Sequence, residues 1–412
     1  MKKIIYITGS LDNPFFLNEI EYIRKAFDDV FVITYDGEKT KSNRIANKYG
    51  IRYNKVSMVK DFPKGFTYFL SWIFSKHVIH EAKALIGTKN AIKKLMYMVY
   101  YGVFDSISSS IIKKEIDDYN GDVILYSFWL SKGAYSIARN SNRPKVKFTI
   151  SRAHGYDLYE ERNSFNYLPF RSFINNKLDC IAFISKNGYS YFNSNYKSNK
   201  NSSKKIVLPL GVSKSEWIKQ NKNDNCIVFA SCSSCIELKR LDLISKFIKA
   251  ISCSTQKRVR WIHIGDGPLF EKYKSTNLGS NVDVLFLGHK ENSQIRTIYS
   301  DYNVDFFINL SDSEGVPVSI MEAMSCGIPC IARDVGGISE IVNNKCGLLI
   351  SDVQNDIVLQ MCAMSVLDIF EHNEKYTTRS MASYNKWRKN YNSIINYDKF
   401  TSLIKKKLFP KQ

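Results

Sequence analysis

No stretch longer than 12 residues in this 412-residue chain lacks Asp, Glu, Lys and Arg. A helix that spans a bilayer needs about 20 consecutive apolar residues, so the sequence contains no candidate for one. Acidic residues are scarce, because 39 Asp and Glu stand against 59 Lys and Arg, a net charge of +20. We therefore expect a soluble or peripheral protein with an anionic partner, such as nucleic acid, a membrane surface or a phosphorylated substrate.

Several motifs of phosphate and metal chemistry are absent. The sequence has no G-x-x-x-x-G-K-[ST] phosphate loop, no H-E-x-x-H and no D-x-D, which would supply paired carboxylates for a metal on a diphosphate. Its nine cysteines are odd in number, and Cys232-x-x-Cys235 has no second pair or flanking His that would complete a zinc set. We expect reduced thiols, no metal, and phosphate binding by cations and backbone amides.

Short apolar runs rich in Val, Ile, Phe and Tyr recur along the chain, with helix-like segments between them. The clearest runs occupy residues 4–8, 30–34, 123–126, 147–151, 181–185, 206–210, 227–231, 260–264, 284–287 and 306–309. Because each run is apolar on both faces, they indicate parallel strands buried between layers of helices. The sequence therefore predicts an α/β fold with its functional sites at the carboxyl ends of the strands.

A polar segment without periodicity, residues 193–204, interrupts this pattern near the middle of the chain. We expect one domain over residues 1–205 and a second over 206–385. Residues 386–412 have the character of a helix with apolar side chains. We expect this helix to pack back on the N-terminal domain.

The positive charge is concentrated in the first half of the chain. Residues 1–210 hold 33 basic and 18 acidic side chains (+15), and residues 39–104 alone hold 13 and 2 (+11). Aromatic residues such as Phe66, Phe69 and Trp72 interleave with these lysines. Such a stretch suits an anionic membrane surface, but it could also stack single-stranded nucleic acid or form a solvated face over an ordinary core. We favour the membrane, and nucleic acid least, because no nucleic-acid-binding motif accompanies the stretch.

The segment 305–342 carries the densest set of functional signals. A strand is followed by a loop with Glu314 and Gly315, and the glycine lets a ligand approach the backbone closely. A helix is predicted to begin near Pro317 and to carry Glu322, eight residues after Glu314. Free amides at this helix start, beside two carboxylates, suit an anion and the paired hydroxyls of a ribose and a hexose. Taken alone, the two glutamates could also be a capping residue and a surface residue.

This segment resembles the E-x7-E signature of the retaining GT-B glycosyltransferases of family four. Besides the two glutamates, the match includes Gly315, Pro317, Ala323, Met324, Gly327, Pro329, Val335–Gly337, Glu340–Val342 and Cys346–Leu349. The resemblance implies two Rossmann-like domains that face a cleft, with a nucleotide-sugar donor bound by the C-terminal one. It also implies that Glu314 contacts the donor sugar and that Glu322 contacts the nucleotide ribose. The amides that hold the sugar hydroxyls would come from the loop Gly315–Val318, which also contains Val316 and Pro317.

Three more predicted strand ends match the donor site of this family. Lys239 and Arg240 resemble the cationic pair that neutralises the donor diphosphate, which makes both of them candidate catalytic residues. The Gly-Arg-Leu that precedes the lysine in many members is replaced by Ser-Cys-Ser-Ser, so which of the two cations contacts the leaving phosphate stays open. Gly265 and Gly288 end two further strands that line the donor site, and His289 is expected to face the base through its backbone.

The N-terminal half is expected to bind the acceptor. The loop Ser151–Arg162 follows a predicted strand and exposes His154 where an α/β enzyme places functional side chains. In related transferases a His in this position lies near the transferred sugar, so His154 is a catalytic candidate, and Arg152 and Asp157 are acceptor-side candidates. Gly9, which follows the first strand, is another. The amino-acid sequence of this loop resembles that of the family members that assemble bacterial surface polysaccharides.

The resemblance implies a retaining, metal-independent glycosyltransferase without a cofactor. It would move a sugar from a nucleotide-diphosphate sugar to a glycan or lipid-linked oligosaccharide in capsule, exopolysaccharide or O-antigen synthesis. The expected location is cytoplasmic, peripheral on the inner face of the cell membrane. Two alternatives stay open: a nucleotide-sugar 2-epimerase of the same fold, which would need no acceptor, and a noncatalytic subunit that keeps the fold.

Overall fold

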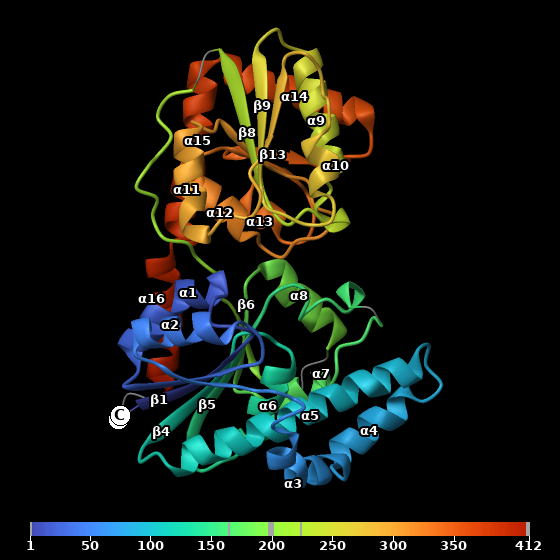
Figure 1. Cartoon of the computed structure of the whole chain (residues 1–412), viewed down its shortest axis with the longest axis vertical. Helices are drawn as coiled ribbons and strands as arrows, with labels where there is room; N and C mark the ends of the chain where they lie inside the picture. Colours follow the sequence, from blue (N-terminus) through green and yellow to red (C-terminus); the bar gives the residue numbers. More distant parts are fainter. Residues whose placement is uncertain (1, 164, 197–201, 223–224, 409–412) are drawn as a thin grey trace. The chain divides into compact units, whose positions relative to one another are not determined.

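A computed structural model describes residues 2–163, 165–196, 202–222 and 225–408. The chain forms two compact units, the first made of the residues up to Leu208 with those from Tyr397 onward, and the second of Pro209–Asn396 (Figure 1). The division lies near the predicted one after residue 205. Within the polar segment that suggested it, residues 197–201 lie outside the described residues.

The first unit is built on a parallel sheet with the strand order β3-β2-β1-β4-β5-β6-β7. Its strands are β1 (Lys2–Thr8), β2 (Asp29–Thr34), β3 (Arg52–Lys55), β4 (Asp122–Ser127), β5 (Val146–Ala153), β6 (Cys180–Phe183) and β7 (Lys204–Val207). Its helices are α1 (Pro14–Ala26), α2 (Lys39–Tyr49), α3 (Phe62–Ile73), α4 (Lys76–Leu85), α5 (Ala91–Asp117), α6 (Lys132–Arg139), α7 (Arg171–Lys177) and α8 (Lys186–Asn195). The short helix η1 (Glu160–Arg162) follows β5.

The second unit contains a parallel sheet with the order β10-β9-β8-β11-β12-β13. Its strands are β8 (Cys226–Cys232), β9 (Arg258–Ile264), β10 (Val282–Phe286), β11 (Phe306–Asn309), β12 (Cys330–Arg333) and β13 (Gly347–Ile350). Its helices are η2 (Glu237–Lys239), α9 (Leu241–Cys253), α10 (Phe270–Lys274), α11 (Asn292–Asp301), α12 (Val318–Ser325), α13 (Ile338–Ile341), α14 (Asp356–Glu371) and α15 (Asn373–Asn390). The predicted α/β architecture is confirmed.

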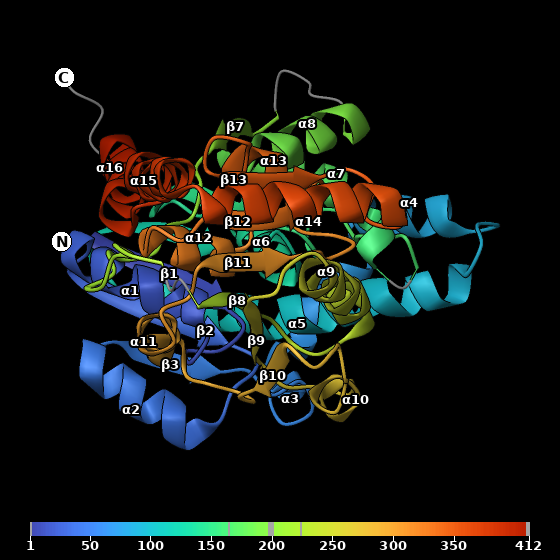
Figure 2. The same ribbon diagram turned by 90° about the horizontal axis from the view of Figure 1, so that it is seen from above.

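Every apolar run that predicted a strand contains one. The strand that the pattern missed in the first unit, β3, has the sequence Arg-Tyr-Asn-Lys and lies at the edge of the sheet, beside α2 (Figure 2). An edge strand has only one paired neighbour and is partly solvated, so it shows no apolar run. In the second unit none of the predicted runs covers β12 or β13; β13 also lies at an edge, whereas β12 lies inside the sheet.

The strand order reverses once in each sheet. In the first unit the chain winds from β1 outward to β3 and then returns to β4 on the other side of β1. In the second unit it winds from β8 to β10 and returns to β11 beside β8. At such a switch point the loops that follow the two central strands diverge, and open α/β sheets bind their ligands there. The expected sites are therefore the loops after β1 and β4 and those after β8 and β11.

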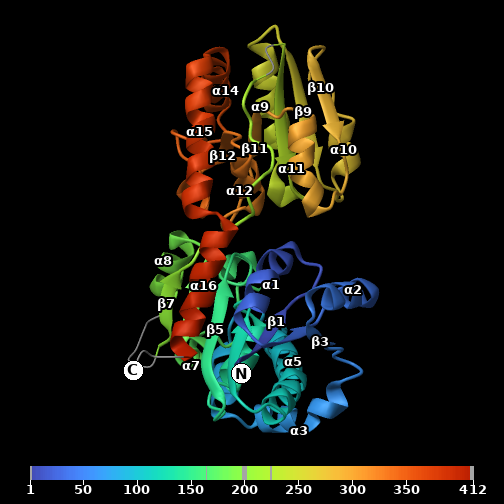
Figure 3. The same cartoon turned by 90° about the vertical axis from the view of Figure 1, so that its left-hand side faces the viewer.

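The C-terminal helix α16 (Ser393–Leu408) begins in the second unit and continues in the first (Figure 3). In the first unit the ring of Tyr397 lies 5.1 Å from that of Tyr22 on α1, and Phe400 lies 5.1 Å from Tyr126 on β4. The predicted single helix over 386–412 is thus two helices, because α15 ends at Asn390.

Arg152 lies in the core of the first unit, with none of its surface exposed. Its guanidinium pairs with Glu19 on α1 at 2.9 Å, donates to the Tyr126 hydroxyl and lies 4.0 Å from the centroid of the Phe400 ring. The interpretation of Arg152 as an acceptor-side residue is therefore wrong for this structure, since its side chain is committed to the core. A buried cation needs a buried anion, and α1 supplies it.

The helices α3 and α4 and the first half of α5 lie within the basic stretch 39–104, and α5 continues to Asp117. Figures 1 and 2 show α4 and the first half of α5 extending beyond the sheet. Exposed apolar side chains lie at the ends of these helices, among them the C-cap residues Phe74 (75 % exposed) and Ile86 (71 %) and, on α5, Ile92 (75 %). Among the described residues, no helix is long and apolar enough to cross a membrane.

We expect the substitution Arg152→Met to destabilise the protein by about 3–5 kcal/mol, because it leaves the Glu19 carboxylate buried without its cation. The double variant Arg152→Met/Glu19→Gln should recover most of this loss. Chemical denaturation of the full chain measures both effects. Wild-type stability of Arg152→Met would contradict the structural role assigned to this pair.

Candidate active site

The loops after β8 and β11 bring together the two residues with the strongest predicted roles. Lys239 ends η2, which follows β8, and Glu314 lies in the loop after β11. The Lys239 ammonium donates to the Glu314 carboxylate at 2.7 Å, and both side chains keep some exposure (21 and 12 %). Asn309, the last residue of β11, lies 3.4 Å from the same carboxylate oxygen. A cation and a carboxylate thus meet at the switch point of the second sheet.

The backbone of the Glu314 loop is held by two glycines that the resemblance included. The amide of Gly337 donates to the carbonyl of Gly315 at 3.0 Å. A Cβ on Gly336 would overlap the carbonyl oxygen of Glu314, and Gly336 has a positive φ of 56°. Only glycine fits such a close approach in this conformation. The Val-Gly-Gly segment therefore sets the shape of the loop that carries Glu314.

The helix α12 begins after this loop and carries Glu322. Pro317 is its N-cap residue and no side chain caps it, so its first amides are not satisfied by a capping group. Val316 is buried and Val318 is the first residue of the helix. The predicted helix start at Pro317 is thus correct, and Gly315, Val316, Pro317 and Val318 form one continuous turn into it.

Glu322 is 3 % exposed and accepts a hydrogen bond from Asn292, the first residue of α11. Burial raises the pKa of its carboxyl group to about 7, although Asn292 and the more distant Arg296 act in the other direction. Asn292 was not identified from the sequence, because 30 residues and the strand β11 separate it from its partner.

Arg240 has a different environment from its neighbour Lys239. Its guanidinium binds Asp242 at 2.8 Å and Asp312 at 2.9 Å, and Asp312 lies two residues before Glu314. Arg333, at the end of β12, pairs with the same Asp312. Of the two predicted cations, Lys239 contacts Glu314 directly, whereas Arg240 is held by two aspartates. Sequence reasoning missed Arg333 and Asp312, since only the pairing of β11 with β12 brings them together.

The end of β9 adjoins the end of β8 on one side and the end of β10 on the other. The amide of Gly265 donates to the carbonyl of Gly288 at 2.9 Å, so the two predicted glycines are paired. A Cβ on Gly265 would overlap the carbonyl oxygen of Ser233, which follows β8. His289 comes next and is exposed. The three strand ends therefore form one surface of closely packed backbone.

The predicted acceptor residue His154 follows β5 in the first unit and is 5 % exposed. Its ring lies 4.5 Å from that of Phe128 and 4.4 Å from that of Trp129, in the loop after β4. Its Nδ1 lies 3.4 Å from the Asp157 carboxylate, while its Nε2 is buried and makes no hydrogen bond with the residues that the structure describes. The structure thus holds the imidazole in an aromatic enclosure, with one buried ring nitrogen unpaired among the described residues.

Asp157 is fully buried and supports this loop. It accepts hydrogen bonds from the amides of His154 and Leu130 at 2.9 and 2.7 Å. Burial alone would raise the pKa of Asp157, but the neighbouring His154 and these amides outweigh it and lower the pKa. Asp157 is therefore a positioning residue for His154, and both its carboxylate oxygens already have partners.

Gly9 follows β1 at the switch point of the first sheet. A Cβ at this position would lie 3.9 Å from the Tyr35 hydroxyl and 4.0 Å from Nε1 of Trp129. The loops after β1, β4 and β5 therefore meet at Gly9, Trp129 and His154.

No group of three or more His, Cys, Asp and Glu side chains among the described residues could hold a metal ion. Cys232 and Cys235 are free, and burial raises the pKa of the Cys232 thiol to about 12. Cys235 lies 3.2 Å from Nε2 of the buried His263.

Comparison with known proteins adds to this geometry. Residues 213–378 match the family described as glycosyl transferases group 1. The O-antigen biosynthesis glycosyltransferase WbnH of Escherichia coli is 28 % identical over 134 residues, which make up 32 % of this chain and 37 % of that protein. The N-acetyl-alpha-D-glucosaminyl L-malate synthase of Bacillus anthracis is 33 % identical over 111 residues, 26 % of this chain and 27 % of that one. These two matches thus span only 37 and 27 % of the relatives' length.

Solved structures share the fold over nearly the whole chain. Anabaena HepE, in complex with UDP-glucose, superimposes with a TM-score of 0.68 at 15 % identity and covers 98 % of this chain and 99 % of that one. The sucrose-phosphate synthase of Thermosynechococcus elongatus gives a TM-score of 0.70 at 13 % identity and covers 100 % of both chains. This likeness shows the two-domain α/β fold of GT-B glycosyltransferases.

The raised pKa of Glu322 makes stability depend on pH. The folded state keeps this carboxyl protonated to about pH 7, whereas the unfolded state loses the proton near 4.5, so stability is lost as pH rises between these values. We expect the free energy of unfolding of the wild type to fall by up to about 3 kcal/mol between pH 5 and 8 because of this group. Glu322→Gln should not show this fall. Chemical denaturation across this range measures it, with the exposed Glu271→Gln as the control. Parallel pH profiles of the wild type and Glu322→Gln would contradict the assignment.

Proposed function

We propose that the chain transfers a sugar from a nucleotide-diphosphate sugar to a glycan acceptor, because residues 213–378 match the family of glycosyl transferases group 1. The second unit binds the donor, and the first unit binds the acceptor. The observation that carries the proposal is the Lys239–Glu314 pair at the switch point of the second sheet, with the buried Glu322 on the following helix.

Each residue of this set has a chemical task in the proposed reaction. Lys239 stabilises the negative charge that develops on the leaving diphosphate, an electrostatic contribution of several kcal/mol in a partly dry site. Glu314 accepts hydrogen bonds from hydroxyls of the transferred sugar, and Glu322 accepts them from the ribose. The contact of 2.7 Å between Lys239 and Glu314 supports this division, because leaving phosphate and transferred sugar are adjacent groups of one donor.

Lys239 rather than Arg240 contacts the leaving phosphate in this proposal. Arg240 is held by the two carboxylates of Asp242 and Asp312, and Arg333 shares the second of them. A guanidinium with two anionic partners has little charge left for a third. Arg240 and Arg333 instead position the loop between β11 and Glu314.

On the acceptor side, Nε2 of His154 has a hydrogen-bonding task. A buried polar atom without a partner costs free energy, which a sugar hydroxyl would recover. Asp157 holds the loop and the ring in place. We propose a retaining outcome in which the leaving phosphate assists deprotonation of the acceptor, since the residues provide no assigned nucleophile. The acceptor class proposed is a glycan or lipid-linked oligosaccharide of surface-polysaccharide synthesis.

We expect Lys239→Ala and Glu314→Gln each to lower kcat by about 10²–10³-fold with little change in folding, because each removes an interaction made with charge or hydroxyls at the reacting centre. The assay combines the purified chain with a panel of nucleotide sugars and lipid-linked glycans, and mass spectrometry identifies the products. The control is Arg260→Gln, which removes a cation of another ion pair in the same unit.

Near-normal turnover by both variants would overturn these roles. Conversion of a UDP-sugar without any acceptor would instead support a nucleotide-sugar 2-epimerase. Binding of the donor without hydrolysis or transfer in any combination would support a noncatalytic subunit.

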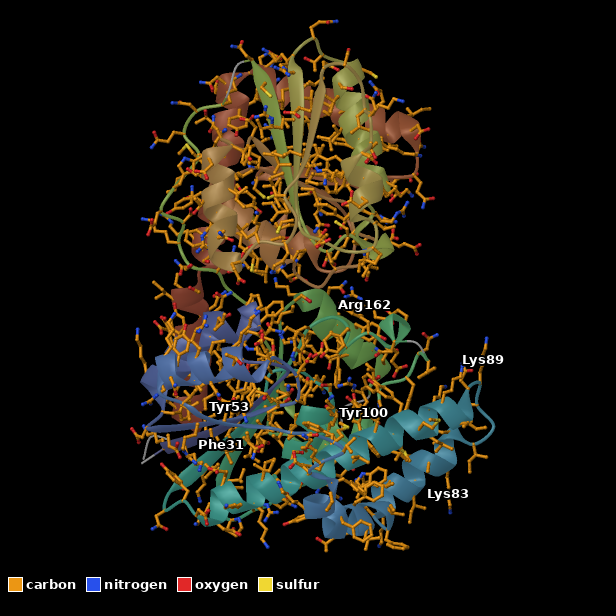
Figure 4. All side chains as sticks on the ribbon, viewed as in Figure 1. Phe31, Tyr53, Lys83, Lys89, Tyr100 and Arg162 are labelled. Carbon is orange, nitrogen blue, oxygen red and sulfur yellow. The ribbon has the colours of Figure 1, made fainter. Side chains whose placement is uncertain are left out.

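A second proposal concerns location: the first unit binds an anionic membrane through α3, α4 and the start of α5, on the inner face of the cell membrane. Exposed Phe74, Ile86 and Ile92 lie among lysines of these helices. Figure 4 shows Lys83 and Lys89 projecting from α4 and from the loop that follows it. Apolar side chains that enter the interface, flanked by cations that pair with anionic headgroups, are typical of peripheral helices.

We expect the double variant Ile86→Ser/Ile92→Ser to weaken binding to vesicles of anionic phospholipid by about 10-fold or more, because both side chains leave water on binding. Salt should weaken the wild type in the same assay. The matched control is Ile357→Ser/Met361→Ser on α14, whose side chains are 73 and 63 % exposed. Wild-type failure to sediment with anionic vesicles at low salt would refute the membrane proposal.

A further inference from the structure

The first unit contains a cavity of about 400 Å³ that no predicted site residue lines. Its lining consists of Tyr35, Tyr97, Tyr100, Tyr101, Ser131, Lys132 and Tyr156. These residues come from the loop after β2, from α5, from the start of α6 and from the loop after β5, so only the fold assembles them. Figure 4 marks Tyr100 on α5. The volume lies within the range of small-molecule sites, and five tyrosines make most of its wall aromatic.

Lys132 is the only charged residue in this lining and is 8 % exposed. Its ammonium donates to the Tyr100 hydroxyl and lies 3.8 Å from the centroid of the Tyr35 ring and 4.5 Å from that of Tyr100. No carboxylate of the described chain forms an ion pair with it. The direct contacts that stabilise its charge are thus ring faces and a hydroxyl.

A buried ammonium without an anion is costly, and the protein shows this cost. Burial lowers the pKa of Lys132 to about 8, and the neighbouring Asp36 offsets only part of the effect. Lys132 is also the first residue of α6, whose N-cap Ser131 makes no side-chain capping bond, and a cation at a helix N-terminus is unfavourable. Arg152 in the same unit has a carboxylate for its charge, whereas Lys132 lacks one.

The cavity adjoins the predicted acceptor residues. Tyr156, which lines it, is 49 % exposed, and its ring lies 4.9 Å from that of Trp129. Trp129 in turn lies 4.4 Å from His154. Tyr35, on the other side, lies next to Gly9. A saccharide that reaches His154 can therefore extend along Trp129 and Tyr156 into the cavity.

We propose that this cavity is an acceptor subsite for an acidic sugar residue, whose carboxylate or phosphate pairs with Lys132 while the tyrosine faces pack on the C–H faces of its ring. The inference rests on the proposed function, since it names the acceptor class of that reaction. The anion supplies the partner that Lys132 lacks, and aromatic faces suit the apolar faces of a pyranose. The cavity would leave a neutral sugar facing an uncompensated cation.

Binding measured without any donor tests the proposal. Isothermal titration calorimetry of the full chain uses methyl glucuronide, methyl glucoside 6-phosphate, methyl glucoside and inorganic phosphate as probes. We expect one or both acidic sugars to bind at least 10-fold more tightly than the neutral glucoside and than inorganic phosphate. Comparison of the affinities for methyl glucuronide and methyl glucoside 6-phosphate shows whether the subsite prefers a carboxylate or a phosphate.

Lys132→Met should abolish this preference and leave the midpoint of unfolding unchanged or raised, because it replaces a buried charge by an apolar side chain of similar length. The matched control is Lys94→Met, a lysine of α5 that also lies near a tyrosine ring, 5.9 Å from that of Tyr167. Tyr156→Ser, at an exposed position, should weaken the binding of both acidic sugars and is a second, independent test of the same cavity.

Equal binding of acidic and neutral sugars, or an acidic preference that survives Lys132→Met, would overturn the subsite. So would binding of inorganic phosphate as tight as that of the sugar phosphate, or competition by uridine monophosphate, which would assign the aromatic wall to a base. We expect the wild type and Lys132→Met to bind UDP with equal affinity. Loss of transfer in all assays would therefore refute the proposed function without touching these binding results.

Discussion

The position of every site in this protein depends on one constraint, the reversal of strand order in a parallel sheet. Parallel strands need crossover helices, so neighbouring loops at the carboxyl edge usually run to the same side. Only where the order reverses do they separate and leave room for a ligand. Lys239 follows β8 and Glu314 follows β11, the two strands on either side of the reversal. In the first unit, Gly9 and Trp129 follow the corresponding β1 and β4.

Close backbone contacts then give these loops a single shape. Gly336 lies against the carbonyl of Glu314, and Gly265 against that of Ser233, so that separate strand ends pack without side chains between them. Such packing leaves a loop little freedom, and the side chains it carries are preorganised. The second unit combines this rigid backbone with charges that offset each other, as in the Lys239–Glu314 pair.

Two of the buried cations in the first unit, Arg152 and Lys132, have opposite roles. Arg152 is neutralised by Glu19 and enclosed by aromatic rings, and this arrangement ties β5, α1 and α16 together. Lys132 is enclosed by tyrosines but lacks a carboxylate in the described chain. Position alone does not separate a structural cation from a binding one, since both are buried near the carboxyl edge of the same sheet. The two differ in whether a carboxylate forms an ion pair with the cation: Glu19 does so for Arg152, and no described residue does so for Lys132.

Much of this protein was readable from residues close together in sequence. Apolar runs determined most of the strands, but they missed the partly solvated edge strand β3 and the short strands β12 and β13. The spacing from Glu314 to Glu322 determined a loop and helix start, because both lie within one β-α segment. The tertiary structure alone decided that Arg152 belongs to the core and that Asp312 joins Arg240 to Arg333. It also brought Tyr35, Tyr100, Lys132 and Tyr156 around one cavity. The physical reason is that local sequence sets backbone conformation and the pattern of burial, whereas the partner of a buried charge is chosen by strand order and helix packing.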